Sequence, residues 1–261
     1  MSSAASDLLR TLHVPGTPLV LANCWDAGSA RLVEAAGFPA VATSSGAVAR
    51  WAGSEDHEVL TAEEALALAT SITGAVSLPV TVDFEAGYGL APDAIAYGLI
   101  SAGAAGCNLE DTDHRTESMV PADAHAAKVA GVRAAAGSSL VINARVDSFL
   151  RGVADPVTDA IERGNRYLDA GADCIYPIGA SDEADIERLV SALGVINVLL
   201  RPGSPSVARC AALGVARIST AAGLWRLMTS QVSAVLQALR DGDDSAFQAR
   251  PERPSEREKG A

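Results

Sequence analysis

Lysine is almost absent from this 261-residue sequence. Only Lys128 and Lys259 occur, and neither follows a predicted strand, so an enzyme that forms a Schiff base through a strand-end lysine is excluded. Basic residues in general are outnumbered, with 20 Lys and Arg against 32 Asp and Glu and a net charge of −12. Such a charge repels the phosphates of nucleic acids and anionic lipids, so we expect neither nucleic acid nor membrane as a partner.

Other features typical of large protein classes are also missing. The four cysteines stand singly, without a CxxC pair, at Cys24, Cys107, Cys174 and Cys210. Single cysteines in apolar segments are typical of reduced, buried thiols in a cytoplasmic protein. Residues 1–10 have neither a basic start nor an apolar core, so we expect no signal peptide. No apolar run approaches the roughly 20 residues of a membrane span, and no GxSxG motif of serine hydrolases occurs.

Short β-branched segments alternate with alanine-rich segments along most of the chain, which predicts an α/β fold. Aromatic residues make up only 4% of the sequence and hydrophobic residues 49%, so the core must consist mostly of Ala, Val, Leu and Ile. The expected strands are 18–24, 40–45, 78–84, 106–110, 140–147, 174–178, 195–200 and 217–220. The expected helices are 28–36, 62–75, 92–102, 121–136, 157–170, 183–193, 206–213 and 224–240.

Eight such βα units predict a closed (β/α)8 TIM-type barrel, which needs about 250 residues. An open doubly wound sheet is the main alternative, but no GxGxxG motif follows the first strand. We therefore expect a single barrel over residues 1–240, including the last helix. Residues 241–261 are polar, charged and contain proline, which predicts a disordered tail.

Charged side chains gather where neighbouring predicted strands end, and barrel enzymes carry their active sites at these ends. The third strand ends with Asp83 and Glu85, the fourth with Glu110, and the fifth with Arg145 and Asp147. Side chains alternate faces along a strand, so Asp83 and Glu85 are expected on one face. A single acid at a strand end is usually a helix cap or a solvated group, but three on adjacent strands would be costly to bury unpaired. Oxygen-only ligands favour Mg²⁺, with Mn²⁺ possible, whereas zinc would need His or Cys.

These segments resemble the isocitrate lyase/phosphoenolpyruvate mutase superfamily, in its phosphonomutase-like branch. The resemblance covers about residues 19–239 and is carried by Asn23-Cys24-Trp25-Asp26, Ser45-Gly46-Ala47, Asp83-Phe84-Glu85-Ala86-Gly87-Tyr88-Gly89, Asn108-Leu109-Glu110-Asp111, Asn143-Ala144-Arg145-Val146-Asp147, Asn197-Val198 and Pro202-Gly203-Ser204-Pro205. It implies a barrel whose C-terminal helix is swapped between subunits of a homo-oligomer, a dimer or a homotetramer. It also implies a Mg²⁺-dependent enzyme that acts on a small 2-oxo or 2-hydroxy acid through a pyruvate-like enolate.

The resemblance implies roles for individual residues. Asp83 would ligate the metal directly, and Glu85 and Glu110 would hold it through water. Arg145 would neutralise carboxylate or enolate charge. The substrate-binding residues would be Trp25, Ser45, the backbone amides of Gly46 and Ala47, Asp56, Arg145 and Asn197. With Glu110 and His114, Arg145 would make up the catalytic group.

The segment after the fourth strand departs from the family pattern. Isocitrate and methylisocitrate lyases carry a Lys-Lys/Arg-Cys-Gly-His loop whose cysteine is the catalytic acid, whereas residues 111–119 contain neither Cys nor Lys. These two activities are therefore not expected. The Lys-Asn-Ser type of mutase loop is also missing, although Thr116 or Ser118 could substitute for it. His114 is the candidate proton donor because imidazole titrates near neutral pH, and the alternative is a solvated loop histidine.

Three functions remain open at this point. The leading hypothesis is a Mg²⁺-dependent lyase or decarboxylase that cleaves a C–C bond in an oxaloacetate-like or substituted malate-like dicarboxylic acid. The second is a phosphoenolpyruvate or phosphonopyruvate mutase or hydrolase that acts on a P–C bond. The third is a catalytically silent barrel that binds a 2-oxo acid. The retained acids at the strand ends argue against the third hypothesis, whereas the loop after the fourth strand does not decide between the first two.

Overall fold

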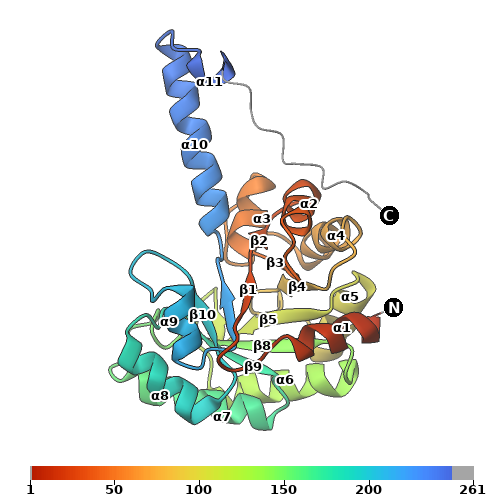
Figure 1. Cartoon of the computed structure of the whole chain (residues 1–261). Helices are drawn as coiled ribbons and strands as arrows, with labels where there is room; N and C mark the ends of the chain where they lie inside the picture. Colours follow the sequence, from red (N-terminus) through yellow and green to blue (C-terminus); the bar gives the residue numbers. More distant parts are fainter. Residues whose placement is uncertain (1, 249–261) are drawn as a thin grey trace, which may run out of the picture. The chain divides into compact units, whose positions relative to one another are not determined.

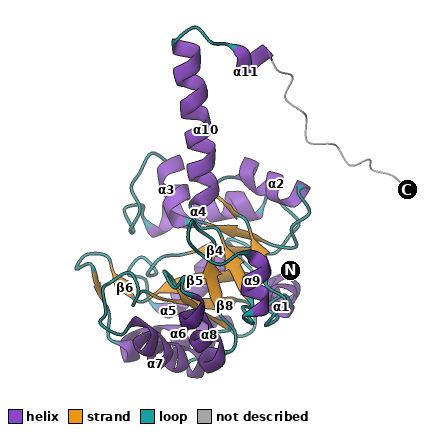
Figure 2. Ribbon diagram, turned by 60° about the vertical axis from the view of Figure 1, so that its left-hand side comes forward, coloured by secondary structure: helices purple, strands orange, loops and turns teal. Residues whose placement is uncertain are grey.

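The computed structural model of the protein describes residues 2–248, and its first 224 residues contain a ring of parallel strands surrounded by helices (Figures 1 and 2). The ring contains β1 (Leu19–Leu21), β2 (Asn23–Cys24), β3 (Val41–Thr43), β4 (Val80–Asp83), β5 (Gly106–Glu110), β8 (Val141–Val146), β9 (Cys174–Pro177), β10 (Asn197–Leu199) and β11 (Arg217–Ser219). The outer helices are α2 (Ala27–Ala35), α4 (Ala62–Thr73), α5 (Pro92–Ser101), α6 (Ala122–Ala136), α7 (Pro156–Asp169), α8 (Glu183–Leu193) and α9 (Val207–Ala212).

The strands close into a barrel. One set of paired strands runs β2-β3-β4-β5-β8-β9 and the other runs β1-β11-β10, all of them parallel. The two sets join at both ends, because β1 and β2 are interrupted only at Ala22 and because Ile175 of β9 bridges Ile196 just before β10. The predicted (β/α)8 barrel is therefore confirmed, and the open sheet is excluded.

Local signals that the sequence carries explain several boundaries. Thr61 begins α4 as a capping box, in which its hydroxyl accepts from the Glu64 amide at 3.2 Å. The Thr61 amide in turn donates to the Glu64 carboxylate at 2.8 Å. These two bonds satisfy backbone groups that a helix start otherwise leaves free.

Three elements of the barrel were not expected from the sequence. They are α1 (Ser2–Thr11), α3 (Ser45–Trp51) and an antiparallel hairpin of β6 (Thr112–Asp113) and β7 (Ser118–Met119). Helix α3 and the hairpin strands are short, so their sequence patterns are weak and tertiary contacts decide their conformation. The hairpin lies within the segment whose sequence departs from the lyase loop.

Helix α1 packs across the N-terminal ends of the strands. Leu9 is fully buried in a cluster with residues that open four strands, namely Leu19, Leu21, Ala40, Ala42, Ala105 and Val141. Arg10 donates to Asp173 at 2.9 Å and to the carbonyl of Leu140 at 3.2 Å, just before β9 and β8 begin. The barrel is thus covered at the end opposite to the strand-end acids.

From Trp225 to residue 248, the described chain forms a second unit, which contains most of α10 (Gly223–Arg240) and α11 (Ser245–Gln248). No residue of α10 is buried. The predicted tail begins at residue 241; α11 lies within it, and residues 249–261 lie outside the described part of the chain. Across residues 2–248, no helix combines the length and the hydropathy that crossing a bilayer would require.

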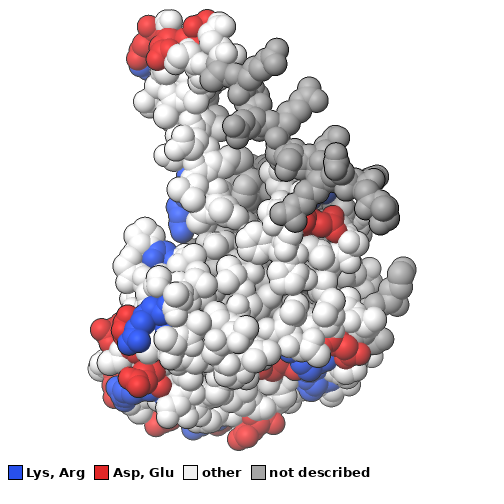
Figure 3. Space-filling model, in the orientation of Figure 1, with Lys and Arg blue, Asp and Glu red and all other residues white. Residues whose placement is uncertain are grey.

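On the face drawn in Figure 3, basic and acidic side chains of the described residues are interspersed. They do not form one broad basic patch on that face.

Candidate active site

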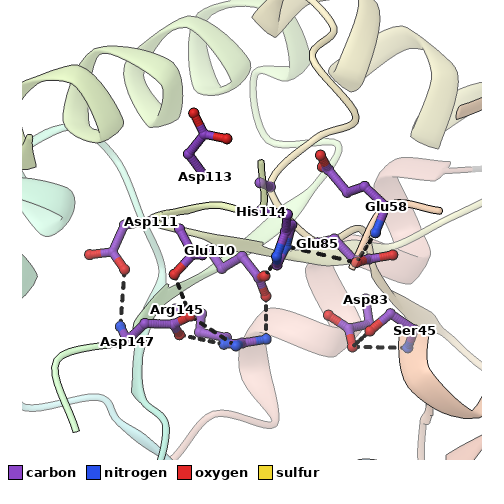
Figure 4. Close-up of polar contacts among 12 residues, drawn as sticks. Ser45, Glu58, Asp83, Glu85, Glu110, Asp111, Asp113, His114, Arg145 and Asp147 are labelled. Carbon is purple, nitrogen blue, oxygen red and sulfur yellow. Dashed lines mark hydrogen bonds and ion pairs between the residues drawn. The ribbon is translucent and has the colours of Figure 1, made fainter. Parts of the chain in front are cut away.

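The strand-end acids and Arg145 meet at the C-terminal mouth of the barrel (Figure 4). Asp83 is paired in register with Asn108, and Glu110 with Arg145. Side chains at paired positions of neighbouring strands project to the same face. The register therefore brings the predicted metal and catalytic residues of β4, β5 and β8 to one place.

Arg145 lies between two buried acids. Its Nη1 contacts Glu110, and its Nε and Nη2 donate to Asp147 at 2.7 and 3.0 Å. Burial raises the pKa of Glu110, although the Arg145 guanidinium and the neighbouring His114 oppose this. Burial also disfavours the charged form of Arg145, but Glu110 and Asp147 outweigh it and raise its pKa. A permanent positive charge is thus fixed at the mouth.

A second network behind Arg145 was not recognised from the sequence. Asp111 is fully buried and accepts the Tyr167 hydroxyl at 2.7 Å, Arg163 at 3.2 Å and the Asp147 amide at 3.0 Å. Burial raises the pKa of Asp111 to about 6, against the lowering effect of the bonds from Tyr167 and Asp147. Because Asp111 anchors the Asp147 backbone, it also fixes the acid that holds Arg145.

Glu85 reaches the site in a different way from the one predicted. The strand ends at Asp83, and Glu85 has a left-handed backbone with φ 47°, so alternation along a strand does not place its side chain. Instead, Glu85 accepts the Tyr88 hydroxyl at 2.6 Å and the Glu58 amide at 2.7 Å. The Tyr88 amide donates to the Glu58 carboxylate at 2.5 Å, so Glu58, Glu85 and Tyr88 are joined in a ring of hydrogen bonds.

The loops around Glu85 hold several strained residues. His57, Glu58 and Tyr88 also have positive φ values, of 73°, 59° and 55°. Strained backbone of this kind clusters at functional sites, where surrounding contacts maintain it. Burial raises the pKa of Glu85 to about 7, the Tyr88 bond opposes the rise, and the negative charges of Asp56, Asp83 and Glu110 add to it.

Asp83 is held by the first residue of α3 on one side and by a residue of β5 on the other. The amide and the hydroxyl of Ser45 donate to Asp83 Oδ2 at 3.0 and 2.9 Å, and Asn108 Nδ2 lies 3.4 Å from Asp83 Oδ1. Ser45 was expected to hold a substrate carboxylate, and that role stays a prediction beside its observed bonds to Asp83. Within the described chain, Ser45 positions the expected metal ligand.

The two predicted backbone donors after Ser45 differ from each other. The Gly46 amide makes no hydrogen bond to any described residue, whereas the Ala47 amide donates to the carbonyl of Ser44 at 3.1 Å. The first turn of α3 uses the Ala47 amide, so its predicted contact with substrate would have to share or replace this bond. A Cβ at Gly46 would lie 2.5 Å from Asp56 Oδ2 and 2.8 Å from Arg50 Nη1, so a larger residue would force one of these side chains to move.

His114 points inward from the β6–β7 hairpin. Its Nε2 lies 2.6 Å from Glu110 Oε1 and 3.8 Å from Glu85 Oε2, and its ring stacks on His57 with centroids 5.0 Å apart. The side chain is only 5% exposed, so the reading of His114 as a solvated loop residue is wrong. Burial lowers its pKa, but the contact with Glu110 and the charges of Glu85 and Glu58 outweigh this and raise it.

Thr116, Ser118 and Asn197 have hydrogen-bond partners outside this cluster. Thr116 and Ser118 are exposed and bond to each other at 2.8 Å. Asn197 is buried inside the barrel, where its amide donates to Ser219 at 3.1 Å rather than to a carboxylate of the mouth. Trp25 is buried and lines a pocket together with Trp51.

The donor set fits a magnesium ion that keeps most of its water. Among residues 2–248, no three His, Cys, Asp or Glu side chains converge closely enough to ligate one ion directly. Mg²⁺ commonly binds one or two carboxylates directly and keeps several waters, and the oxygen-only side chains of Asp83, Glu85 and Glu110 suit that chemistry. Asp56 Oδ1 is also buried without a hydrogen-bond partner in this part of the chain, as expected of an acid that faces hydrated metal.

A sequence model of phosphoenolpyruvate phosphomutases matches residues 9–240. The chain belongs to the phosphoenolpyruvate phosphomutase family. Its resemblance to the isocitrate lyase/phosphoenolpyruvate mutase superfamily is thereby confirmed. Family members differ in the bond on which they act, so membership alone leaves the reaction open.

The relatives of this chain include proteins that are named for different reactions. The oxaloacetate decarboxylase of Chromohalobacter salexigens is 32% identical over 74% of this chain and 71% of its own. A Burkholderia cenocepacia protein of known structure carries a provisional description as a phosphonomutase. It is 37% identical to this chain, with a TM-score of 0.85, and the match covers 89% of this chain and 99% of that one. A phosphonopyruvate hydrolase solved with oxalate and Mg²⁺ is 26% identical with a TM-score of 0.80, covering 93% and 90%.

Proposed function

We propose that the protein is a Mg²⁺-dependent lyase or decarboxylase that cleaves a C–C bond in a small 2-oxo or 2-hydroxy dicarboxylic acid. The observation that carries this proposal is the mouth cluster, in which Asp83, Glu85 and Glu110 face the buried cation Arg145. An acidic protein needs such local positive charge, from a metal and an arginine, to bind a small dianion. The similarity to an oxaloacetate decarboxylase supports the same reaction class.

The residues of the mouth would have separate roles in the reaction. A divalent ion bound by Asp83, and through water by Glu85 and Glu110, would supply Lewis-acid polarisation of the substrate's 2-oxo group. The free amide of Gly46 would donate to a substrate carboxylate. For a 2-oxo acid such as oxaloacetate, the bond between C3 and C4 would break, CO₂ would leave, and the electron pair of the bond would enter the enolate. Arg145 would neutralise the negative charge that develops in this step.

The proton that converts the enolate into a 2-oxo acid would come from His114 Nε2. This atom is buried beside Glu110 and lies on an element that can present it to the mouth. Trp25 would border the substrate, and Asp56 would face the hydrated ion. Asn197 bonds inside the barrel, so we propose an indirect role for it, in holding β10 and β11 in place.

A substrate panel tests the proposal directly. The protein, freed of metal and then supplied with Mg²⁺ or EDTA, is assayed for pyruvate or another 2-oxo acid with oxaloacetate, 2-methylisocitrate, dimethylmalate and phosphonopyruvate. We expect Mg²⁺-dependent turnover of oxaloacetate or dimethylmalate, with at least a roughly 100-fold loss in EDTA, because the metal stabilises charge in the transition state.

Each other outcome of the panel has a definite meaning. Turnover of phosphonopyruvate alone would move the reaction to the P–C bond, which the similarity to a phosphonopyruvate hydrolase makes the second candidate. No turnover of any of the four, with Mn²⁺ and oxalate still bound, would contradict the lyase proposal and favour a silent 2-oxo-acid-binding barrel.

Replacing His114 by Gln tests the proposed proton donor. We expect kcat to fall by about 100-fold, the typical contribution of a positioned acid, while the Kd for Mn²⁺ changes less than about threefold. Glutamine keeps a hydrogen-bonding group next to Glu110 but cannot release a proton at neutral pH. His57→Gln, at the exposed ring on which His114 stacks, is the matched control. An H114Q protein with wild-type kcat would remove His114 from the reaction.

We also propose that the protein is a cytoplasmic homo-oligomer, a dimer or a tetramer that swaps α10 between subunits. The support is the apolar stripe of α10, with exposed Leu227, Met228, Val232, Leu236 and Leu239 at helical spacing. The four free, buried cysteines agree with a reducing compartment. Light scattering that shows a monomer, or cell fractionation outside the cytoplasm, would contradict these two statements.

A further inference from the structure

We propose that Arg217 and Asn108 are positioning residues, which together fix the orientation of Asp83 for a divalent ion. This inference rests on the proposed function, because it assigns a purpose to the arrangement below the expected metal ligand. Neither residue was assigned a role from the sequence. The two lie inside the barrel, beneath the mouth cluster.

Arg217 is an unusual residue for the centre of a barrel. It lies on β11, is 1% exposed and has no Asp or Glu within ion-pair distance among residues 2–248. Its Nη2 donates to Asn108 Oδ1 at 3.2 Å, and its Nη1 lies 3.5 Å from His13 Nε2. A buried guanidinium without a carboxylate partner is costly, so its position calls for a compensating role.

Asn108 connects this cation to the mouth. Its Oδ1 accepts both Arg217 Nη2 and Asn143 Nδ2, the latter at 2.8 Å. Two donors at the oxygen fix which way the amide faces, because a flipped amide would direct its NH₂ group at both of them. The amide nitrogen is therefore left facing Asp83 Oδ1, at 3.4 Å.

The result is a chain of oriented groups that ends at the metal ligand. Ser45 holds one oxygen of Asp83 and Asn108 approaches the other, so the carboxylate plane is set from two sides. Arg217 also places positive charge below a mouth with three acids, while Arg145 is already engaged by Glu110 and Asp147. Groups that orient metal ligands in this way typically contribute 10- to 100-fold to metal affinity.

The test is Mn²⁺ binding to the metal-free full-length protein, measured by electron paramagnetic resonance and calorimetry without substrate. We expect Arg217→Met and Asn108→Ala each to raise the Kd for Mn²⁺ by about tenfold or more. Arg133→Met is the matched control. Arg133 is a partly buried arginine near the N-terminal ends of the strands that donates to Asp173 and to the Leu140 carbonyl, and not to Asn108.

The thermal unfolding midpoint of each variant separates positioning from general stability. A Kd raised in R217M and N108A but unchanged in R133M, at similar losses of stability, supports the inference. A wild-type Kd in either folded variant overturns it, and N108A decides the question if R217M does not fold. If the wild-type protein itself binds no Mn²⁺, the proposed metal site fails instead, and the two failures are thus distinguished.

Discussion

Replacing Asp83 by Asn should reduce Mg²⁺-dependent kcat/KM by on the order of 1,000-fold or more, with the fold retained. Asparagine has nearly the same shape as aspartate, and its side-chain oxygen can still accept the two bonds from Ser45. It lacks the negative charge that a direct metal ligand contributes. Steady-state kinetics over a Mg²⁺ titration, with Mn²⁺ affinity measured on the same preparation, check this prediction.

Asp113→Asn provides the comparison for this substitution. Asp113 is also an acid of the mouth loops, but it pairs with the exposed Arg115 and makes no contact with Asp83 or Glu110. We expect D113N to stay within about threefold of wild type in kcat/KM, because exposed ion pairs contribute little. A D83N protein that keeps its activity to within tenfold would remove Asp83 as the metal ligand, and with it the proposed mechanism.

Replacing Arg145 by Met should lower the free energy of unfolding by about 3–5 kcal/mol, the cost of breaking a buried ion pair by removing one partner. Glu110 and Asp147 are 2% and 0% exposed, and both bind the same guanidinium. Without it, two carboxylates remain buried next to each other. Urea unfolding of the metal-free protein at pH 8 measures the change, and activity should be lost as well.

Two further variants make this prediction specific. Arg166→Met removes an exposed arginine that pairs with the exposed Asp123, and we expect a loss below about 1 kcal/mol. Adding Glu110→Gln to R145M should recover part of the stability, since one of the uncompensated charges is removed. A loss below 1 kcal/mol in R145M would show that water or another cation reaches these acids.

The barrel could be predicted from the sequence because each strand carries its own signal. Gly106–Glu110 and Glu183–Leu193 have the predicted bounds, and the other predicted helices and strands differ mainly at their ends. Local propensity and alternation decide such elements. They do not decide α1 or the β6–β7 hairpin, whose conformations depend on what they pack against, such as the cluster around Leu9.

The charged residues of the site could be predicted from the sequence, whereas several of their hydrogen-bond partners could not. Strand-end position was sufficient to bring Asp83, Glu110 and Arg145 together, because register in a barrel follows from strand pairing. Ser45 could not be given its partner, since a hydroxyl beside a carboxylate can bind protein as well as substrate. Arg217 did leave a signal, a charged residue at the start of an otherwise uncharged strand, but its meaning depends on Asn108, more than 100 residues away in the sequence.

Helix α1 has a consequence for how substrate and product enter and leave the barrel. Because Leu9 and Arg10 cover the ends of the strands opposite the mouth, whatever binds at the acids must enter and leave by the same opening. Product has to depart before the next substrate can approach. A 2-oxo acid product that accumulates would therefore compete with substrate for this one opening. The more tightly the enzyme binds its own product, the slower its turnover would become.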